Sequence, residues 1–182
     1  MLSPRWTSAP PFAIAARPLR QPGSLTARLA RSGKVTVDVL ASGWQAAGAD
    51  EAAALGLTRP GMRIYARLVC VRRDGRPAVL ARSITTVKGV RVCWKRLHHL
   101  GRQPLATLLW SDPRISRGPF EFARLASDDP LARAIGLAAA APARRSTFRH
   151  QGEPLIVMEA FLDLPWPTLD WSTRRRRWAA VA

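Results

Sequence analysis

The amino-acid sequence predicts an α+β fold, with a single antiparallel sheet of about five to six strands and short helices inserted between the strands. Two observations lead to this prediction. Apolar runs of strand length are joined by turn-forming pairs such as Asp74-Gly75, which favour direct hairpins. The segments with helical spacing are short and lie between these runs. A chain of 182 residues is long enough for one core and short for two, so we expect one folded domain.

Residues 1–23 are predicted to form an irregular N-terminal arm. The segment is rich in proline, and the first acidic residue of the chain is Asp38. Its arginines, serines and alanines give it the composition of a mitochondrial transit peptide, but it lacks a clean amphipathic period. We therefore interpret it as an arm on a cytoplasmic protein.

Three elements are expected between the arm and the centre of the chain. Ser24 is a suitable N-cap for a short helix over residues 25–30. Valines at every second position then predict a half-buried strand over residues 35–40. Residues 44–61 are rich in alanine and glycine, and we expect a connection with one helical turn over residues 51–55.

The centre of the chain is predicted to be a β-hairpin with strands over residues 62–71 and 77–87. The Asp-Gly pair between them tolerates the positive φ angles of a type I′ turn. Each strand carries a charge inside its apolar run, Arg67 in the first and Arg82 in the second. Such charges need a partner or a function, because burying an unpaired charge is costly.

Two short helices are expected next, over residues 92–100 and 104–110, with Gly101 ending the first. His98 and His99 lie in the first helix, but no cysteine, aspartate or glutamate stands at ligand spacing from them. We therefore interpret the two histidines as an exposed helix end, and the sequence predicts no metal site.

The last part of the chain returns to strands. A short strand over residues 120–122 and a helix over 131–137 precede a hairpin of residues 144–150 and 154–162. The final strand carries Glu159 in the middle of the run P-L-I-V-M-E-A-F-L-D-L-P. A buried carboxylate is expected to be paired, to be protonated, or to face a pocket where its unusual pKa is used.

The chain is strongly basic, with 29 Lys and Arg against 12 Asp and Glu and a formal net charge of +17. This favours an anionic partner: nucleic acid, an acidic membrane surface or a small polyanionic substrate. The alternative is that arginine covers ordinary solvated faces. In the C-terminal extension, residues 166–182, tryptophans surround the run Arg174–Arg177. Such a segment can make peripheral contact with an anionic membrane, and a solvated extension is the alternative.

Cys70 and Cys93 have neither the spacing of metal ligands nor that of a disulfide framework. Both have apolar neighbours, so we expect core residues in a reducing compartment. The apolar stretches are too short for a membrane-spanning helix. The motifs of nucleotide-binding, serine-hydrolase and zinc-protease sites are also missing from the sequence.

Four segments form a more specific pattern: S-L-T-A-R-L-A-R-S-G-K-V-T-V, I-Y-A-R-L-V-C-V-R-R-D-G-R-P-A-V-L-A-R, L-G-R-Q-P-L and A-R-R-S-T-F-R-H-Q-G-E-P-L-I-V-M-E-A-F-L-D-L-P. In this order they resemble the chorismate lyase family, whose members convert chorismate into 4-hydroxybenzoate and pyruvate. The resemblance covers residues 24–165, which we expect to be the catalytic domain. It implies short helices over a ligand pocket and a cofactor-independent lyase at the first committed step of ubiquinone biosynthesis.

The resemblance also implies site residues. Arg67 stands at the position of the arginine that binds the ring carboxylate, and Glu159 at that of the glutamate facing the 4-hydroxyl end of the ring. These two are the expected catalytic residues, and both also bind substrate. Leu105 matches a leucine whose backbone contacts the carboxylate, and Leu25 replaces a methionine that lines the pocket. Arg82 is the first candidate for binding the second carboxylate. The alternatives are Arg144, Arg145 and Arg149.

Two departures from the family pattern concern the pocket. Thr86 lies where the family has a proline, and residues 123–143 form an insertion where the family covers its site with helical flaps. Of these two, we expect the insertion to affect substrate access.

Two other functions stay open. One is a non-catalytic ligand-binding domain of the same fold, as in bacterial transcription regulators. Those domains are fused to a winged-helix domain, which residues 1–23 are too short and too proline-rich to form. The other is a basic nucleic-acid-binding module, which leaves the charges inside the strands unexplained. We therefore expect a monomer whose partner is chorismate rather than nucleic acid, with no cofactor.

Overall fold

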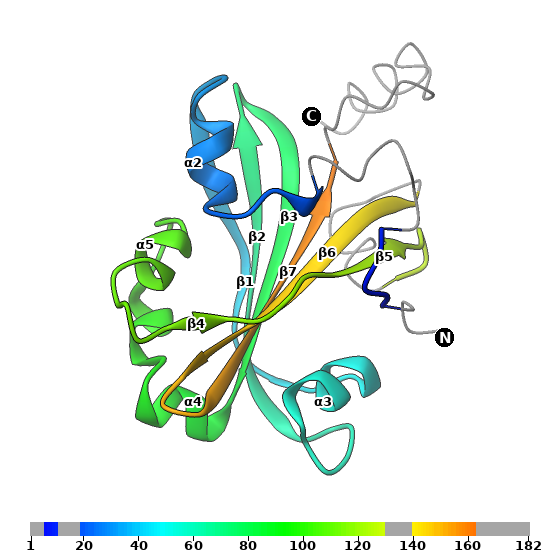
Figure 1. The fold of residues 1–182 in the computed structure, drawn as a ribbon, viewed down its shortest axis with the longest axis vertical. Helices are drawn as coiled ribbons and strands as arrows, with labels where there is room; N and C mark the ends of the chain where they lie inside the picture. Colours follow the sequence, from blue (N-terminus) through cyan, green and yellow to red (C-terminus); the bar gives the residue numbers. More distant parts are fainter. Residues whose placement is uncertain (1–5, 11–18, 130–139, 163–182) are drawn as a thin grey trace.

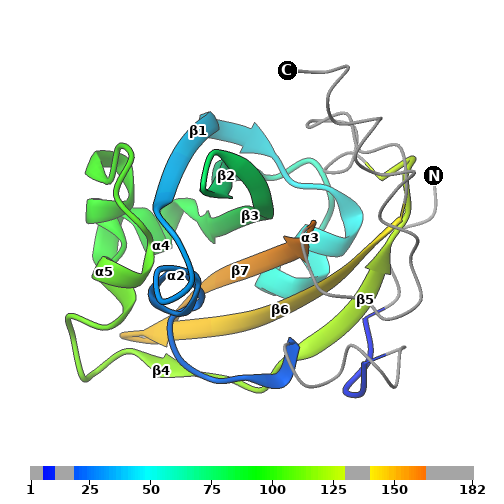
Figure 2. The same ribbon diagram turned by 90° about the horizontal axis from the view of Figure 1, so that it is seen from above.

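The computed structural model describes residues 6–10, 19–129 and 140–162, and every structural statement below concerns these residues. They form an open antiparallel sheet with short helices on both faces (Figures 1 and 2). The predicted α+β class is confirmed. The sheet has seven strands rather than five to six. The additional strand has two residues, which is too short for a sequence pattern to indicate.

The strand order is β1-β2-β3-β7-β6-β4, and β5 also pairs with β6. The first three strands form a meander, and the β6–β7 hairpin adds β7 to the edge of β3. The short strands β4 and β5 pair with the two ends of β6. The bounds are β1 Val35–Ala46, β2 Arg63–Arg73, β3 Arg76–Thr86, β4 Ser116–Arg117, β5 Glu121–Leu125, β6 Ala141–His150 and β7 Glu153–Phe161.

The central hairpin has the predicted turn. Asp74 and Gly75 have φ angles of 50° and 76°, as a type I′ turn requires. Gln151 and Gly152, at 51° and 80°, connect β6 to β7 in the same way. Both turns have two residues, so each fixes which residues face one another at the start of its ladder.

The helices are short: α2 Leu25–Leu29, α3 Ala49–Leu55, α4 Val87–Val92, a 3-10 helix Lys95–His99, and α5 Ala106–Leu109. The predicted helix over residues 92–100 is wrong in its bounds. Thr86 caps α4 by accepting a hydrogen bond from the Gly89 amide, so this helix starts earlier. The amide of Trp94, a buried residue, donates to the Gly89 carbonyl and closes α4 before the 3-10 turn. The predicted helix over residues 131–137 lies outside the described residues.

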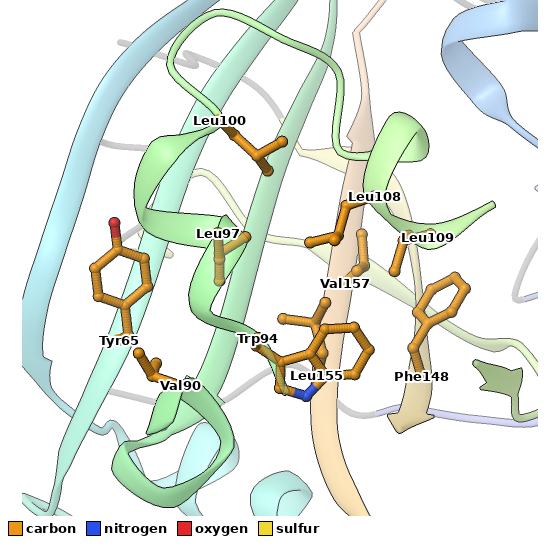
Figure 3. Close-up of a cluster of buried hydrophobic side chains, with 10 residues drawn as sticks. All are labelled: Tyr65, Val90, Trp94, Leu97, Leu100, Leu108, Leu109, Phe148, Leu155 and Val157. Atoms are coloured by element: carbon orange, nitrogen blue, oxygen red, sulfur yellow. The ribbon is translucent and has the colours of Figure 1, made fainter. Parts of the chain in front are cut away.

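Two layers of helices cover the sheet. On one face, α4, the 3-10 helix and α5 pack against apolar side chains of β2, β6 and β7, as Figure 3 shows. On the other face, α3 packs through Ala52 and Leu55 against Ile84 and Ile156. Because both faces are covered, the central strands are apolar on both sides. No helix among the described residues is long and apolar enough to cross a membrane.

Candidate active site

A cavity opens between the sheet and helices α2 and α5. Its floor is made by side chains of β2, β3 and β7 that point to the same face. It encloses about 670 Å³ of space free of protein atoms, including its opening.

Arg67 enters this cavity from the middle of β2 and is only 2% exposed. Its Nη2 donates hydrogen bonds to the carbonyls of Gly101 and Gln103, at 2.8 and 3.0 Å. These carbonyls belong to the loop between the 3-10 helix and α5, so the loop orients the guanidinium. Burial lowers the pKa of Arg67, but arginine remains charged. Among the described residues, no carboxylate pairs with it.

Glu159 reaches the same cavity from β7, two strands away from Arg67. Its side chain is 15% exposed and accepts a hydrogen bond from Arg144 Nε at 2.5 Å. Arg144, on β6, is 1% exposed, and its Nη1 donates to the carbonyls of Leu19 and Gln21. Glu159 therefore combines two of the predicted alternatives, since it is paired and it also faces a pocket.

Leu25 and Leu105 line the cavity from the two helices that flank it. Leu25 is the first residue of α2, which Ser24 caps by accepting a hydrogen bond from the Ala27 amide at 3.1 Å. Leu105 directly precedes α5. The structure thus brings Leu25, Arg67, Leu105 and Glu159 together around one cavity.

The structure does not place Arg82 at this cavity. Its neighbours Ala81 and Ser83 line the cavity, so Arg82 points to the opposite face of the sheet. There its Nε donates to Glu51 of α3 at 2.6 Å and its Nη2 to Gln45 at 3.0 Å. The structure thus places the guanidinium of Arg82 against α3 and not with the predicted site residues, so this geometry does not favour Arg82 as the group that binds the second carboxylate.

Two of the three alternative arginines are also engaged elsewhere. Arg145 lies on the face of Arg82 and pairs with Asp50 and Glu121. Arg149 is exposed, and its Nη1 donates to the carbonyl of Gly152. Arg144 alone of the three lies on the cavity face, where it holds Glu159.

Arg117 lines the cavity but was missed by the sequence analysis. It lies on the two-residue strand β4, and its Nε donates to Ser146 Oγ at 2.9 Å. Its guanidinium carbon is 3.9 Å from the ring centroid of Phe120 and 5.2 Å from that of Phe148. Burial, together with the positive charge of Arg144, lowers its pKa to about 10. The surrounding sequence has no periodicity from which its position could be predicted.

The cavity carries an excess of positive charge. Arg67, Arg117 and the adjacent Arg144 face a single carboxylate, that of Glu159. Such a site favours an anion with more than one negative charge. The described residues contain no group of three or more His, Cys, Asp or Glu side chains that could hold a metal ion.

The two predicted departures from the family pattern have structural explanations. Thr86 caps α4 and also donates to Glu153 at 3.1 Å, so it supports the helix. In the insertion, residues 123–125 and 141–143 pair with each other as parts of β5 and β6. They do not line the cavity, so these parts of the insertion are not a flap over the site. Residues 130–139 lie outside the description.

The fold is similar to that of solved structures of transcription regulators and their domains. The C-terminal domain of the histidine utilization repressor from Pseudomonas syringae pv. tomato aligns with a TM-score of 0.53 and 15% identity, over 75% of this chain and 100% of that domain. A GntR-family transcriptional regulator from Bacillus cereus aligns with a TM-score of 0.54 and 10% identity, over 76% of this chain and 99% of the other. At these identities, the similarity concerns the fold alone.

Sequence similarity is closer to another group of proteins. A "Probable chorismate pyruvate-lyase 1" from Burkholderia pseudomallei is 39% identical over 168 residues, which cover 88% of this chain and 91% of the relative. A "Probable chorismate pyruvate-lyase" from Azoarcus sp. is 42% identical over 171 residues, covering 86% and 89%. The family model for chorismate lyase matches residues 6–169. The chain therefore belongs to the chorismate lyase family.

Proposed function

We propose that this protein cleaves chorismate into 4-hydroxybenzoate and pyruvate without a cofactor. The observation that carries the proposal is that Arg67 and Glu159 line the same cavity. The charge of Arg67 has no carboxylate partner among the described residues, so it is available for the carboxylate of a ligand. Chorismate is a dianion with one carboxylate on its ring. A buried arginine fork can bind such a carboxylate through two hydrogen bonds.

The reaction is an elimination. The C4–H bond and the bond from the ring to the enolpyruvyl ether oxygen break, the ring becomes aromatic, and the released enolpyruvate takes up a proton to become pyruvate. Arg67 holds the ring carboxylate, which places the 4-hydroxyl end of the ring toward Glu159. Glu159 then accepts the C4 proton or orients the hydroxyl group. The elimination consumes no oxidant or reductant, so its stoichiometry needs no redox cofactor.

The contact between Arg144 and Glu159 supports this role. A carboxylate that accepts a hydrogen bond from a buried guanidinium is held in one orientation, which a group that acts on one position of the ring requires. Arg144 is held in turn by the carbonyls of Leu19 and Gln21, so its position is fixed on both sides.

The proposal is tested by incubating purified protein with chorismate and following both products. We expect 4-hydroxybenzoate and pyruvate to appear in equal amounts, each dependent on enzyme concentration. Glu159→Gln should lose most of this activity. Glu121→Gln is its matched control, since Glu121 also pairs with an arginine but lies on the other face of the sheet. Absence of both products with the wild-type protein would reject the activity.

A non-catalytic ligand-binding domain is the second candidate, because the fold is similar to that of solved structures of transcription regulators and their domains. It predicts that chorismate binds and is recovered unchanged. Placement in ubiquinone biosynthesis, the cytoplasm and the monomeric state remain predictions. Sedimentation through a gradient gives the mass of the protein in solution and so tests the monomeric state. Measuring quinone in a strain that lacks the gene tests the place in ubiquinone biosynthesis.

A further inference from the structure

A row of paired residues crosses the sheet from Arg67 to Ser146, whose side chain contacts Arg117. Arg67 on β2 faces Ser83 on β3, Ser83 faces Val157 on β7, and Val157 faces Ser146 on β6. Ser146 Oγ accepts the hydrogen bond from Arg117 Nε. The backbone positions of Arg67 and Ser146 are three strand spacings apart, roughly 14 Å at about 4.8 Å each, and Arg117 lies on the next strand, β4. The side chains of Arg67 and Arg117 both line the cavity that lies between them.

Arg117 also differs from the other arginines near the sheet in its charge partners. Arg82, Arg144 and Arg145 each have a carboxylate oxygen within 2.9 Å. Within the described residues, Arg117 and Arg67 have none. Glu159 attracts Arg117 from a distance but is paired with Arg144. Keeping a partly buried positive charge without a carboxylate in direct contact is costly, which indicates that a ligand supplies the negative charge.

The surroundings of Arg117 orient it for planar recognition. The rings of Phe120 and Phe148 lie close to its guanidinium, and Ser146 occupies Nε. An arginine held by aromatic rings keeps the N–H groups at its edge available for a carboxylate. The remaining groups, Nη1 and Nη2, have no hydrogen-bond partner in the described part of the chain.

We propose that Arg117 binds the enolpyruvyl carboxylate of the substrate. The inference rests on the proposed function and extends it to the second carboxylate, the role that the sequence analysis assigned first to Arg82. Glu159 lies on β7 two residues after Val157, so its side chain points to the same face of the sheet as that of Val157. Because β7 lies between the strands that carry Arg67 and Arg117, Glu159 reaches the cavity between the two arginines. A dianion with its ring carboxylate at Arg67 and its second carboxylate at Arg117 would present C4 of its ring to Glu159. Arg117 would then bind the carboxylate of the leaving group as the ether bond breaks.

The test uses two stable probes that carry the ether at the ring position it has in chorismate and differ by one carboxylate: 3-(carboxymethoxy)benzoate, a dianion, and 3-methoxybenzoate, a monoanion. Calorimetry with the wild-type protein should show that the dianion binds at least tenfold more tightly. Arg117→Gln should remove most of this advantage and leave the affinity for 3-methoxybenzoate within about twofold. Arg67→Gln should weaken both probes. Arg91→Gln, which removes an exposed arginine of α4, should change neither and controls for net charge.

Two further variants keep the test decisive. Arg117→Lys retains the charge but loses the planar fork, so it should retain only part of the dianion advantage. Ser146→Ala removes the acceptor of Nε and should lower the advantage while the monoanion binds as before. Should Arg117→Gln weaken both probes equally, or neither, Arg117 is structural and the inference is wrong.

The chorismate assay separates this inference from the proposed function. If the wild-type protein forms no 4-hydroxybenzoate, the activity is wrong, but a dianion advantage that depends on Arg117 would still support the second anion site. If the wild-type protein is active and Arg117→Gln has an unchanged KM for chorismate, only the inference fails. The expected result is a KM raised at least tenfold with an unchanged inhibition constant for 4-hydroxybenzoate.

Discussion

Glu159 and Arg144 face each other across the β6–β7 ladder and form a largely buried ion pair beside the cavity. Removing one partner of such a pair often costs roughly 3–5 kcal/mol of stability, because the other charge is left buried. A substitution that tests the chemistry of Glu159 must therefore retain a hydrogen-bond acceptor for Arg144. Glutamine meets this condition and cannot exchange the proton.

We accordingly predict that Glu159→Gln folds but loses most turnover, by roughly 10²–10⁴-fold as is typical for a general acid or base. Formation of 4-hydroxybenzoate from chorismate measures turnover, and circular dichroism verifies the fold. Unchanged turnover would make Glu159 a structural residue. Glu121→Gln, at the Arg145 pair on the other face, should retain full activity.

Arg67 permits a second prediction. Arg67→Lys preserves the charge but not the planar fork, so 4-hydroxybenzoate should bind more weakly by roughly 1–3 kcal/mol. Titration calorimetry measures this difference directly. Tight binding by the lysine variant would indicate that the ring carboxylate is held by another group, and Arg117 would be the first to examine.

The same sequence signal singled out Arg67, which lines the cavity, and Arg82, which lies on the opposite face of the sheet. In a regular ladder starting from the Asp-Gly turn, Arg82 would pair with Arg67 and share its face. A β-bulge after Val71 shifts the register by one residue, so Ser83 pairs with Arg67 and Arg82 points toward α3. The hairpin and its turn could be predicted from sequence, but the bulge could not, since it depends on packing along the whole strand.

Side-chain contacts hold α2 and the segment before it in place. A five-residue helix is unstable alone, so its position must come from its surroundings. Arg28 donates to the side chain and carbonyl of Gln21 and to the carbonyl of Pro22, at 2.6 to 3.1 Å. Arg144 holds the same segment from β6. These contacts place Leu25 at the wall of the cavity.

We therefore predict that Arg28→Ala raises the KM for chorismate several-fold, because the wall formed by Leu25 is no longer fixed. Arg31→Ala, three residues away and exposed, should leave KM unchanged. Steady-state kinetics of the two variants at constant ionic strength make the comparison. Equal effects of both substitutions would mean that only net charge matters.

Element types were easier to predict than their ends. The long strands β2, β3 and β7 follow apolar runs in the sequence, because they are covered on both faces. The α4 region was harder, since its apolar spacing fits a helix over residues 92–100. The chain turns at Trp94, which is fully buried in the cluster of Figure 3 and interrupts the helix. Tertiary packing thus overrides a local pattern.

The net charge of the whole chain is +17, which is far more positive charge than the few arginines at the cavity supply. The run Arg174–Arg177 contributes to this excess. We predict that removing residues 172–182 leaves chorismate cleavage in solution intact but weakens adsorption to anionic vesicles, with a steep dependence on salt. Sedimentation with vesicles that contain or lack anionic lipid measures the adsorption. Loss of activity on truncation would instead show that this segment, which lies outside the described residues, contributes to the fold.

Ligand binding should stabilise the whole fold, because the cavity is bordered by the sheet, α2 and α5 together. At 100 times its dissociation constant, 4-hydroxybenzoate should stabilise the protein by about 2.7 kcal/mol. For a domain of this size each kcal/mol raises the melting temperature by roughly 2–4 °C. Phenol lacks the carboxylate that Arg67 is proposed to bind, so it should produce no shift at the same concentration. In Arg67→Lys the shift with 4-hydroxybenzoate should shrink, and equal shifts with both ligands would show that the carboxylate contributes nothing to binding.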